Sequence, residues 1–282
     1  MKDLLRISNL SKKNIYEIFS IAAQIELYKN SFQGKHFVLF FPDSSIRTMI
    51  TFEAAINFLG GNIVRFPSTV LDKEESIEDV VGYMNNWVDG IIVRHNSDEC
   101  MRQIANYSFS PVINAMSGSS HPCEILADFY SFQKLIPDFE QKRYVFVGPS
   151  GNIGNSYYEA SKILGYSFLQ VCKEGYEISG AKAVYNLKDA VKDADIILTD
   201  SLGKETREIF KDLIINDDIL RLAPPGVLVN PCPPIHRGYE VSESILHRPS
   251  FVGYEFKASL KIIQTAIIVF LEREKNFSNK VC

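Results

Sequence analysis

The sequence predicts an α/β protein with two domains, each built on a parallel β-sheet flanked by helices. Short apolar runs typical of buried strands alternate with amphipathic helical segments along the chain. The same alternation starts again at Arg143, with a glycine-containing turn after its first strand. A length of 282 residues exceeds what one hydrophobic core usually serves. We therefore expect two Rossmann-like domains.

The strands are expected where apolar runs are bounded by turn residues, and the helices where apolar residues recur three and four apart. The strands are Phe37–Phe41, Asn62–Phe66, Asp89–Arg94, Pro111–Asn114, Arg143–Val147, Phe168–Val171, Asp195–Thr199, Gly226–Asn230 and Ser250–Tyr254. The helices are Leu4–Lys29 (one or two, with a cap near Ser8–Ser11), Ser45 to the Gly60-Gly61 stop, Ile77–Trp87 capped by Ser76, Ile125–Leu135, Leu187–Ala194 and Ala258–Lys275. Phe210–Leu222 is amphipathic.

The domain boundaries follow from the end of one long helix. Ile136, Pro137 and Asp138 end the helix before the second α/β unit, so we place the first domain at residues 1–135 and the second at 136–257. The C-terminal helix within 258–282 has an apolar face that we expect to pack back on the first domain.

Composition and charge exclude several classes of protein. The chain is 46% hydrophobic and 23% charged, as in ordinary globular domains. A net charge of −4 without a basic block speaks against partners such as nucleic acid or an anionic membrane surface. The N-terminus lacks the apolar core of a signal peptide, and the apolar run Ile262–Leu271 is too short to span a bilayer.

The cysteines indicate a reducing compartment. The chain has five, none in a CxxC pair, which argues against a disulfide framework and against a zinc site. We therefore expect a cytoplasmic protein without a metal site.

Ser45, Arg47 and Thr48 stand at the start of a predicted helix, directly after the strand Phe37–Phe41. A helix N-terminus offers free N–H groups and the positive end of a dipole. Hydroxyls and a guanidinium at this position make an anion cradle suited to phosphate. The alternative is an ordinary N-cap with a surface arginine.

Arg94 and His121 also follow predicted strands, and Pro122 suits the first turn of a helix. The carboxyl ends of parallel strands share one edge of a sheet, where functional groups collect. The sequence therefore predicts that Ser45, Arg47, Thr48, Arg94 and His121 converge. The alternative for His121 is a helix-capping or core histidine.

The glycines of the second domain do not form a dinucleotide-binding motif. Gly148, Gly151 and Gly154 are spaced by three, which is not G-x-G-x-x-G, and Cys172-Lys173 stands where an acidic residue would bind a ribose. An NAD-dependent oxidoreductase is therefore disfavoured.

Taken together, these segments resemble the aspartate/ornithine carbamoyltransferase family over nearly the whole chain. Ser45-Ile46-Arg47-Thr48 is similar to the family's S-T-R-T signature, and His121-Pro122-Cys123-Glu124 to its H-P-x-Q. Thr199-Asp200-Ser201-Leu202-Gly203 resembles a shortened T-D-x-W-x-S-M-G. The loop from Cys232, with Arg237-Gly238-x-Glu240-Val241, resembles the ornithine-type H-C-L-P loop.

The resemblance implies transfer of a carbamoyl group from carbamoyl phosphate to an amine, without metal or organic cofactor. The first domain would bind carbamoyl phosphate and the second an amino acid or amine. The implied catalytic residues are Arg47, Arg94 and His121, and Ser45, Ile46, Thr48 and Glu124 would complete the carbamoyl phosphate site. The implied acceptor residues are Asn152, Asp200, Ser201, Leu202, Cys232 and Pro233.

Three of the acceptor residues also have an ordinary structural explanation. Asn152 suits a turn, Asp200 a strand-end cap, and Cys232 a small buried filler. An ornithine-like acceptor is favoured over aspartate, because the cationic Arg-x-Gln-x-Glu-Arg pattern that a dicarboxylate needs is not found after Asp200.

Several departures from the family pattern indicate a divergent member. Glu124 replaces the usual glutamine, Pro231 the usual histidine, and Ser259-Leu260 a late Asn-Arg pair. A non-catalytic paralogue, acting as a ligand-binding or regulatory subunit, is therefore the alternative function. The resemblance also implies a homotrimer or a multiple of trimers, with Lys73 reaching into a neighbour's site.

Overall fold

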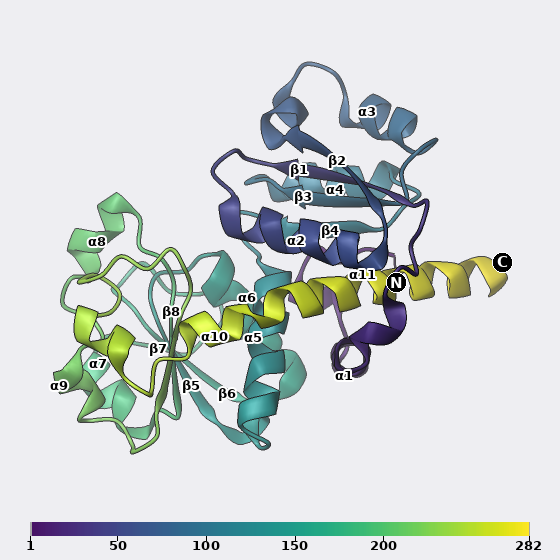
Figure 1. The fold of residues 1–282 in the computed structure, drawn as a ribbon. Coiled ribbons are helices and arrows are strands. Elements are labelled where there is room, and N and C mark those ends of the chain that lie inside the picture. The colour runs from purple at the N-terminus through teal and green to yellow at the C-terminus, as the bar shows by residue number, and fades with distance from the viewer. Residues whose placement is uncertain (1, 282) are drawn as a thin grey trace. The chain divides into compact units, whose positions relative to one another are not determined.

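The chain folds into two compact units, each with one parallel sheet and helices on both faces (Figure 1). The computed structural model describes residues 2–281, with side chains through residue 275; Cys282 lies outside the described residues. Unit 1 comprises Met1–Ser131 and Ala258–Cys282, and unit 2 comprises Phe132–Lys257. The predicted fold class is confirmed.

The sheet of unit 1 has four parallel strands in the order β2-β1-β3-β4. Their bounds are β1 His36–Phe41, β2 Asn62–Pro67, β3 Gly90–Arg94 and β4 Val112–Met116. The two central strands, β1 and β3, are almost entirely buried, whereas β2 lies at an edge and is largely exposed. The end of β1, which precedes the predicted phosphate cradle, and the end of β3, which carries Arg94, are therefore neighbours in the sheet.

Helices cover both faces of this sheet. On one face lie α1 (Lys12–Ala23), α2 (Ile46–Leu59) and α11 (Ser259–Val281), and on the other α3 (Ile77–Met84) and α4 (Asp98–Tyr107). α11 packs against α1 and α2, which confirms that the C-terminal helix returns to the first domain. No helix among the described residues is long and apolar enough to cross a membrane.

Several helix boundaries lie where capping residues predict them. The Ser76 hydroxyl accepts from the N–H of Asp79 and caps α3, Pro122 is the first residue of α5 (Pro122–Leu135), and Gly60 ends α2 with a left-handed φ of 80°. Short 3₁₀ helices, η1 Ile7–Asn9, η2 Ile25–Tyr28, η3 Ser68–Asp72, η4 Phe139–Gln141, η5 Val191–Asp193 and η6 Glu243–His247, occupy connecting segments.

Unit 2 has five parallel strands in the order β7-β6-β5-β8-β9. The strands are β5 Arg143–Val147, β6 Ser167–Val171, β7 Ala183–Val184, β8 Ile196–Thr199 and β9 Leu228–Pro231. The helices, besides the end of α5, are α6 Asn152–Leu164, α7 Leu187–Ala190, α8 Lys204–Phe210, α9 Asp217–Leu220 and α10 Gly253–Lys257.

The two faces of the unit 2 sheet follow strand alternation. Val145 and Val229 point into a core shared with Phe210 of α8, whereas Phe146 faces α6, where it lies against Gly154. Because β5, β8 and β9 are adjacent and parallel, the loops that follow them leave the same edge of the sheet.

The strand predicted at Ser250–Tyr254 is wrong. Within this range only Phe251 forms a bridge, to Val229, because its N–H closes a turn onto the Arg248 carbonyl and α10 begins at Gly253. Phe210–Leu222 is not one amphipathic element, since α8 ends at Phe210 and α9 begins at Asp217.

The helix predicted over Leu4–Lys29 begins only at Lys12. Ser11 caps it by accepting from the N–H of Asn14, as the predicted mid-segment cap implies. Leu4 instead extends the sheet, because its backbone bonds to Val112 and Asn114 next to β4. The sequence analysis did not predict α4 or β7, which the structure contains.

Gly90 is a close-packing position that can be tested. A Cβ at Gly90 would lie 2.6 Å from the Phe37 ring, which is itself 3% exposed. We expect Gly90→Ala to lower the free energy of unfolding by about 1–3 kcal/mol, measured by urea denaturation. The matched control is Gly82→Ala in α3, where the new Cβ meets no heavy atom within 4 Å and stability should be unchanged or higher. An equal loss of unfolding free energy in the two variants would contradict this explanation. So would a Gly90→Ala substitution that costs as much in a Phe37→Leu protein as in the wild type.

Candidate functional site

Arg94 lies across the start of α2 and joins the predicted phosphate cradle into one cluster. Its Nη1 donates to Ser45 Oγ at 3.1 Å and to Thr48 Oγ1 at 3.2 Å. Ser45 stands at the N-cap position, but its side chain makes no capping hydrogen bond. The ordinary N-cap explanation therefore does not apply to Ser45, because its hydroxyl accepts from the arginine instead.

The position of Arg94 follows from an irregularity at the end of β3. The pairing of β3 with β4 shifts register between Val93 and Arg94, so that Arg94 lies opposite Met116. A β-bulge of this kind changes the direction of the side chain that follows it. The strand therefore delivers a guanidinium to the helix end, where N–H groups and the helix dipole also favour an anion.

His121 directly precedes α5 and Glu124 lies in its first turn, and both are buried, at 6% and 5% exposure. The carbonyl of His121 accepts from the N–H of Ile125 at 3.4 Å, which places the residue at the helix entrance. Residues three apart lie on the same side of a helix, so the imidazole and the carboxyl group share one face. This face begins at the same sheet edge as Arg94, because β3 and β4 are neighbours.

A polar network that the sequence prediction missed holds the loop before His121. Ser117 Oγ donates to Asp98 of α4 and accepts from the Ser120 N–H at 3.2 Å and from Asn114 Nδ2, also at 3.2 Å. Ser117 N–H in turn donates to the Ser120 carbonyl at 2.8 Å. The loop is thus closed on itself and fixed to α4, which restricts where His121 can lie.

Cys123, between the two, is not a nucleophile. Its thiol is fully buried and donates to the carbonyl of Asn114 at 3.6 Å. Burial raises the pKa of the Cys123 thiol far above its usual range, and the charge of Glu124 adds to the effect. Burial likewise raises the pKa of Cys100 and of Cys172 to about 11 each.

Arg47, Ile46 and Lys73 differ from the cluster in being exposed. Ile46 keeps 64% exposure, and the side chains of Arg47 and Lys73 make no hydrogen bond or ion pair with the residues that the structure describes. The structure therefore joins Ser45, Thr48 and Arg94 by direct contacts.

In unit 2, three adjacent strands end beside the predicted acceptor residues. Asn152 opens α6 after β5, Asp200 and Ser201 follow β8, and Cys232 follows β9. Asp200 Oδ2 lies 3.7 Å from the position of a Cβ on Gly151, so its carboxyl group faces the turn that leads to Asn152. Residues from three separate strand ends are thus brought to one edge of one sheet.

Two further contacts define this edge. The Cys232 N–H donates to the Thr199 carbonyl at 3.0 Å, which ties the end of β9 to the end of β8. Cys232 is 9% exposed, and its thiol lies 3.8 Å from the carbonyl of Pro233, the residue that forms a cis peptide with Pro234. Leu202 is buried, with its N–H bonded to Glu240.

Glu240 and His236 are residues of this edge to which the sequence prediction assigned no role. Glu240 Oε1 accepts from the Leu202 N–H at 2.7 Å and lies 3.1 Å from His236 Nδ1. Glu240 falls within the Arg237-Gly238-x-Glu240-Val241 segment that carries the family resemblance, and this is the signal that could have identified it.

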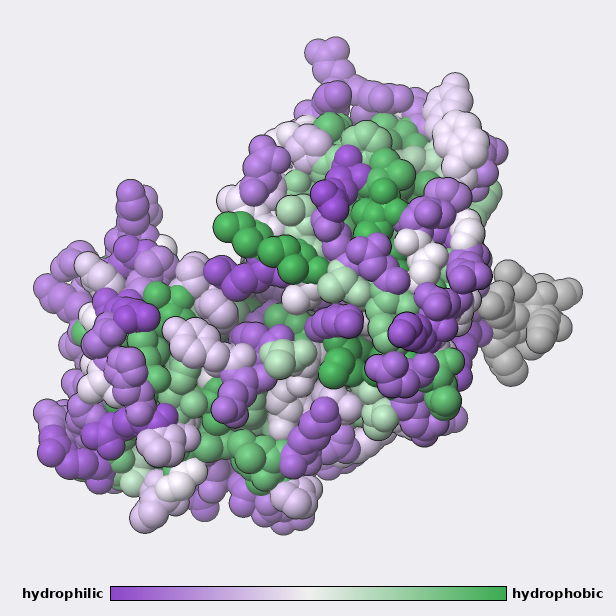
Figure 2. All heavy atoms as spheres, viewed as in Figure 1, coloured by the Kyte–Doolittle hydropathy of each residue, from purple (hydrophilic) through white to green (hydrophobic). Residues whose placement is uncertain are grey.

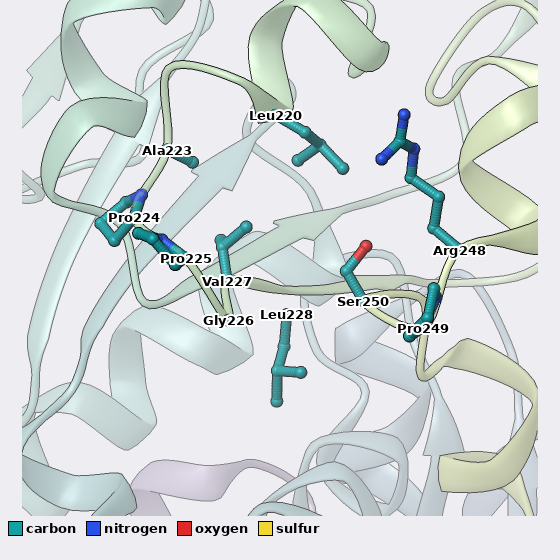
Figure 3. Close-up of a pocket in the computed structure, with 10 residues that line it drawn as sticks. All are labelled: Leu220, Ala223, Pro224, Pro225, Gly226, Val227, Leu228, Arg248, Pro249 and Ser250. Carbon is teal, nitrogen blue, oxygen red and sulfur yellow. The ribbon is translucent and has the colours of Figure 1, made fainter.

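A separate surface pocket lies away from these residues. It has a volume of about 480 Å³ and is lined by Leu220, Ala223–Leu228 and Arg248–Ser250 (Figure 3). Gly226 and Val227 precede β9, so the pocket lies at the opposite edge of the sheet from Cys232. The Arg248 side chain pairs with Asp217. Within the described part of the chain, no three His, Cys, Asp or Glu side chains are grouped as metal ligands would be.

Comparison with known proteins extends the similarity over both units. Residues 2–134 match the family domain described as "Aspartate/ornithine carbamoyltransferase, carbamoyl-P binding domain", and residues 140–271 match the corresponding Asp/Orn binding domain. The ornithine carbamoyltransferase of Methanosarcina acetivorans is 32% identical over 300 residues, covering 96% of this chain and 99% of the relative.

Solved structures agree with this similarity. The ornithine carbamoyltransferase of Pyrococcus furiosus has a TM-score of 0.90 at 27% identity, covering 95% of this chain and 96% of the other. The anabolic ornithine carbamoyltransferase of Campylobacter jejuni also has a TM-score of 0.90 at 27% identity, with 97% and 100% covered. With both family domains matched in order and the relative similar over its full length, the chain belongs to the aspartate/ornithine carbamoyltransferase family, on the side of its ornithine-type members.

Proposed function

We propose that this protein transfers the carbamoyl group of carbamoyl phosphate to the amine of an ornithine-like amino acid or small amine, releasing phosphate. The observation that carries the proposal is the hydrogen-bonded cluster of Arg94, Ser45 and Thr48 at the start of α2. The names of the matched family domains and of the relatives support the same reaction.

The phosphate end of the substrate binds at the start of α2. Arg94 and Arg47 supply positive charge, and the first turn of the helix, from Ile46 onward, supplies N–H groups. The phosphate gains charge as the bond to the carbonyl carbon breaks, so fixed cations at this position stabilise the transition state more than the bound substrate. Ser45 and Thr48 hold Arg94 in place before the substrate arrives.

The carbamoyl end lies at the start of α5. The carbonyl oxygen becomes an oxyanion when the amine attacks, and His121 donates a hydrogen bond to it together with Arg94. Glu124 accepts from the carbamoyl NH₂ group, since a carboxylate has acceptor capacity that suits an NH₂ donor. The reaction requires no metal or organic cofactor, because phosphate is already a good leaving group.

The acceptor binds at the carboxyl edge of the unit 2 sheet. Asp200 pairs with an ammonium group and Asn152 donates to a carboxylate. Ser201, Leu202 and Pro233 line the rest of the site, and the thiol of Cys232 lies beside the reacting amine.

The decisive experiment is a product assay. Purified protein is incubated with carbamoyl phosphate and a panel of amines that includes L-ornithine, shorter and longer diamino acids and simple diamines. We expect a ureido product, detected by mass spectrometry, with at least one of them. If no amine gives a product and phosphate release is no faster than in Arg47→Ala, the proposal is wrong.

His121→Ala is expected to lower turnover by about 100-fold or more, because an oxyanion donor acts mainly in the transition state. Carbamoyl phosphate affinity, measured by calorimetry, should change far less. His36→Ala, at an exposed histidine of β1, is the matched control and should keep wild-type kinetics. Wild-type turnover in His121→Ala would remove this residue from the mechanism.

Asp200→Asn is expected to raise the KM for the amine by about 10-fold or more, because the lost charge pair with an ammonium contributes roughly 1.5–3 kcal/mol. The affinity for carbamoyl phosphate should stay close to that of the wild type. Asp193→Asn, an exposed aspartate paired with Arg143, is the matched control. The opposite pattern, weaker carbamoyl phosphate with an unchanged amine KM, would place Asp200 outside the acceptor site.

We further propose a cytoplasmic homotrimer, or a multiple of trimers. β2 is an edge strand with exposed Val64 and Phe66, at 42% and 43%, and Ile50 of α2 is 57% exposed. Figure 2 shows apolar side chains on the part of unit 1 that carries α2 and β2. An open strand edge with apolar side chains is suited to contact between copies of one chain. The four described cysteines are free and buried, as a reducing compartment permits.

A shared site can be tested by mixing inactive variants. If Lys73 completes the site of a neighbouring subunit, Lys73→Ala and Arg94→Ala should each lose most activity. Mixed trimers, formed by joint denaturation and refolding, should regain part of it, because some sites then combine native residues from two chains. In the control mixture, Lys134→Ala, a variant at a residue outside the site, takes the place of Lys73→Ala. Sedimentation velocity checks that the refolded mixtures form trimers. No recovery in mixed trimers would mean that Lys73 does not act between subunits.

A further inference from the structure

Ser201, His236 and Glu240 form a cluster within unit 2 at the edge where the acceptor residues lie. Ser201 Oγ is 3.3 Å and Glu240 Oε1 is 3.1 Å from His236 Nδ1. The Glu240 side chain is 2% exposed, whereas that of His236 keeps 31% exposure. A buried carboxylate thus holds a partly exposed imidazole.

Glu240 fixes the ring by joining the loops after β8 and β9. Its Oε1 accepts from the Leu202 N–H at 2.7 Å, and its Oε2 accepts from the His236 backbone N–H, also at 2.7 Å. With Nδ1 facing the carboxylate, the ring proton belongs on Nδ1 and the lone pair on Nε2. Glu240 therefore determines both the orientation of the ring and the nitrogen that can accept a proton.

His236 Nε2 makes no hydrogen bond with any residue that the structure describes. The ring is partly exposed, and it belongs to the loop that carries Cys232 and Pro233. Its neighbour Ser201 lies next to Asp200 in the proposed acceptor site. A basic nitrogen is thus available at the edge where an acceptor amine would bind.

The arrangement differs from that of a hydrolytic serine triad. In such a triad the serine and the carboxylate contact opposite nitrogens of the imidazole. Here Ser201 and Glu240 both contact Nδ1, so His236 cannot take the serine proton through Nε2 while Glu240 holds Nδ1. Ser201 is therefore not an activated nucleophile, and Nε2 is left for a ligand.

We propose that His236 is the base that deprotonates the acceptor amine, with Glu240 as its positioning residue; this rests on the proposed carbamoyl transfer. The Nε2 lone pair takes one proton from the ammonium, which leaves a neutral amine. The amine nitrogen bonds to the carbamoyl carbon, and the bond from that carbon to the phosphate oxygen breaks. Phosphate leaves with the electron pair and takes the second proton of the nitrogen, while His236 releases its proton to water. Glu240 stabilises the imidazolium between these steps.

Glu240 is the charged group shown in contact with His236. Arg237 follows His236 in the chain and pairs with Glu243, Asp200 precedes Ser201 in the chain, and the Arg207 guanidinium of α8 lies over the Tyr239 ring at 5.1 Å. Arg207 Nε donates to the Leu202 carbonyl at 3.0 Å. A pH profile must therefore be compared between variants that leave these groups unchanged.

The test uses His236→Asn in the full-length protein, because the asparagine amide still donates to Glu240 but has no group at Nε2. With carbamoyl phosphate and the amine that the wild type accepts, kcat at neutral pH should fall by about 100-fold. The KM for carbamoyl phosphate should stay within about twofold. As the pH rises, kcat of the variant should climb with the fraction of unprotonated amine, whereas the wild-type rate should level off earlier. A purely structural role for His236 would not produce this difference in pH profile.

The matched control is His247→Asn. His247 lies 3.8 Å from Glu243 in an exposed histidine–glutamate pair, and its loss should leave kcat unchanged. If His236→Asn does not fold, judged by thermal melting, Glu240→Gln tests the same step and should lower kcat by about 10-fold or more.

The outcomes separate the two proposals. If His236→Asn keeps the wild-type kcat while the wild type forms product normally, the role of His236 is overturned but the transfer reaction stands. If His236→Asn is unfolded, a wild-type kcat in Glu240→Gln leads to the same conclusion. A wild type that carbamoylates no amine overturns the transfer reaction and the base with it.

Discussion

The hydrogen bonds of Arg94 to Ser45 and Thr48 are the interaction on which the candidate site depends. They join the end of a central strand to the start of a helix that follows the neighbouring strand. The Arg94 guanidinium already donates to these two hydroxyls before any substrate binds. The rotamer entropy of its side chain is therefore lost during folding and not during binding. An anion that enters the cradle therefore meets a charge that is already oriented.

Unit 2 repeats this construction with the opposite charge. Glu240 joins two loops that leave adjacent strands, as Arg94 joins a strand and a helix in unit 1. In both cases a charged side chain holds backbone or hydroxyl partners from a neighbouring strand end. Parallel sheets bring such ends together, so one charged side chain can bond to partners from two of them.

Two of the departures from the family pattern lie where the acceptor and the carbamoyl NH₂ would bind. Glu124 is buried at the entrance of α5, and Pro231 ends β9 where the family has a histidine. The cradle keeps Ser45, Thr48 and its two arginines, with Ile46 in place of the signature's threonine. Under the proposed function, these two departures would alter the surroundings of the second substrate and of the carbamoyl NH₂ more than the phosphate end of the site.

The sequence by itself determined the α/β class, most of the strands and the cradle, because apolar runs, caps and strand-end motifs are local signals. It failed at Ser250–Tyr254, where a turn and a helix start reduced the predicted strand to one bridge, and at Leu4, which joins the sheet through bonds to residues more than a hundred positions away. Only the tertiary structure decided that Ser45 serves Arg94 and not its own helix. It also decided that Ser201 and the buried Glu240 both contact Nδ1 of His236. Those contacts join residues from different strand ends, and sheet order, which no local pattern encodes, sets which ends are neighbours.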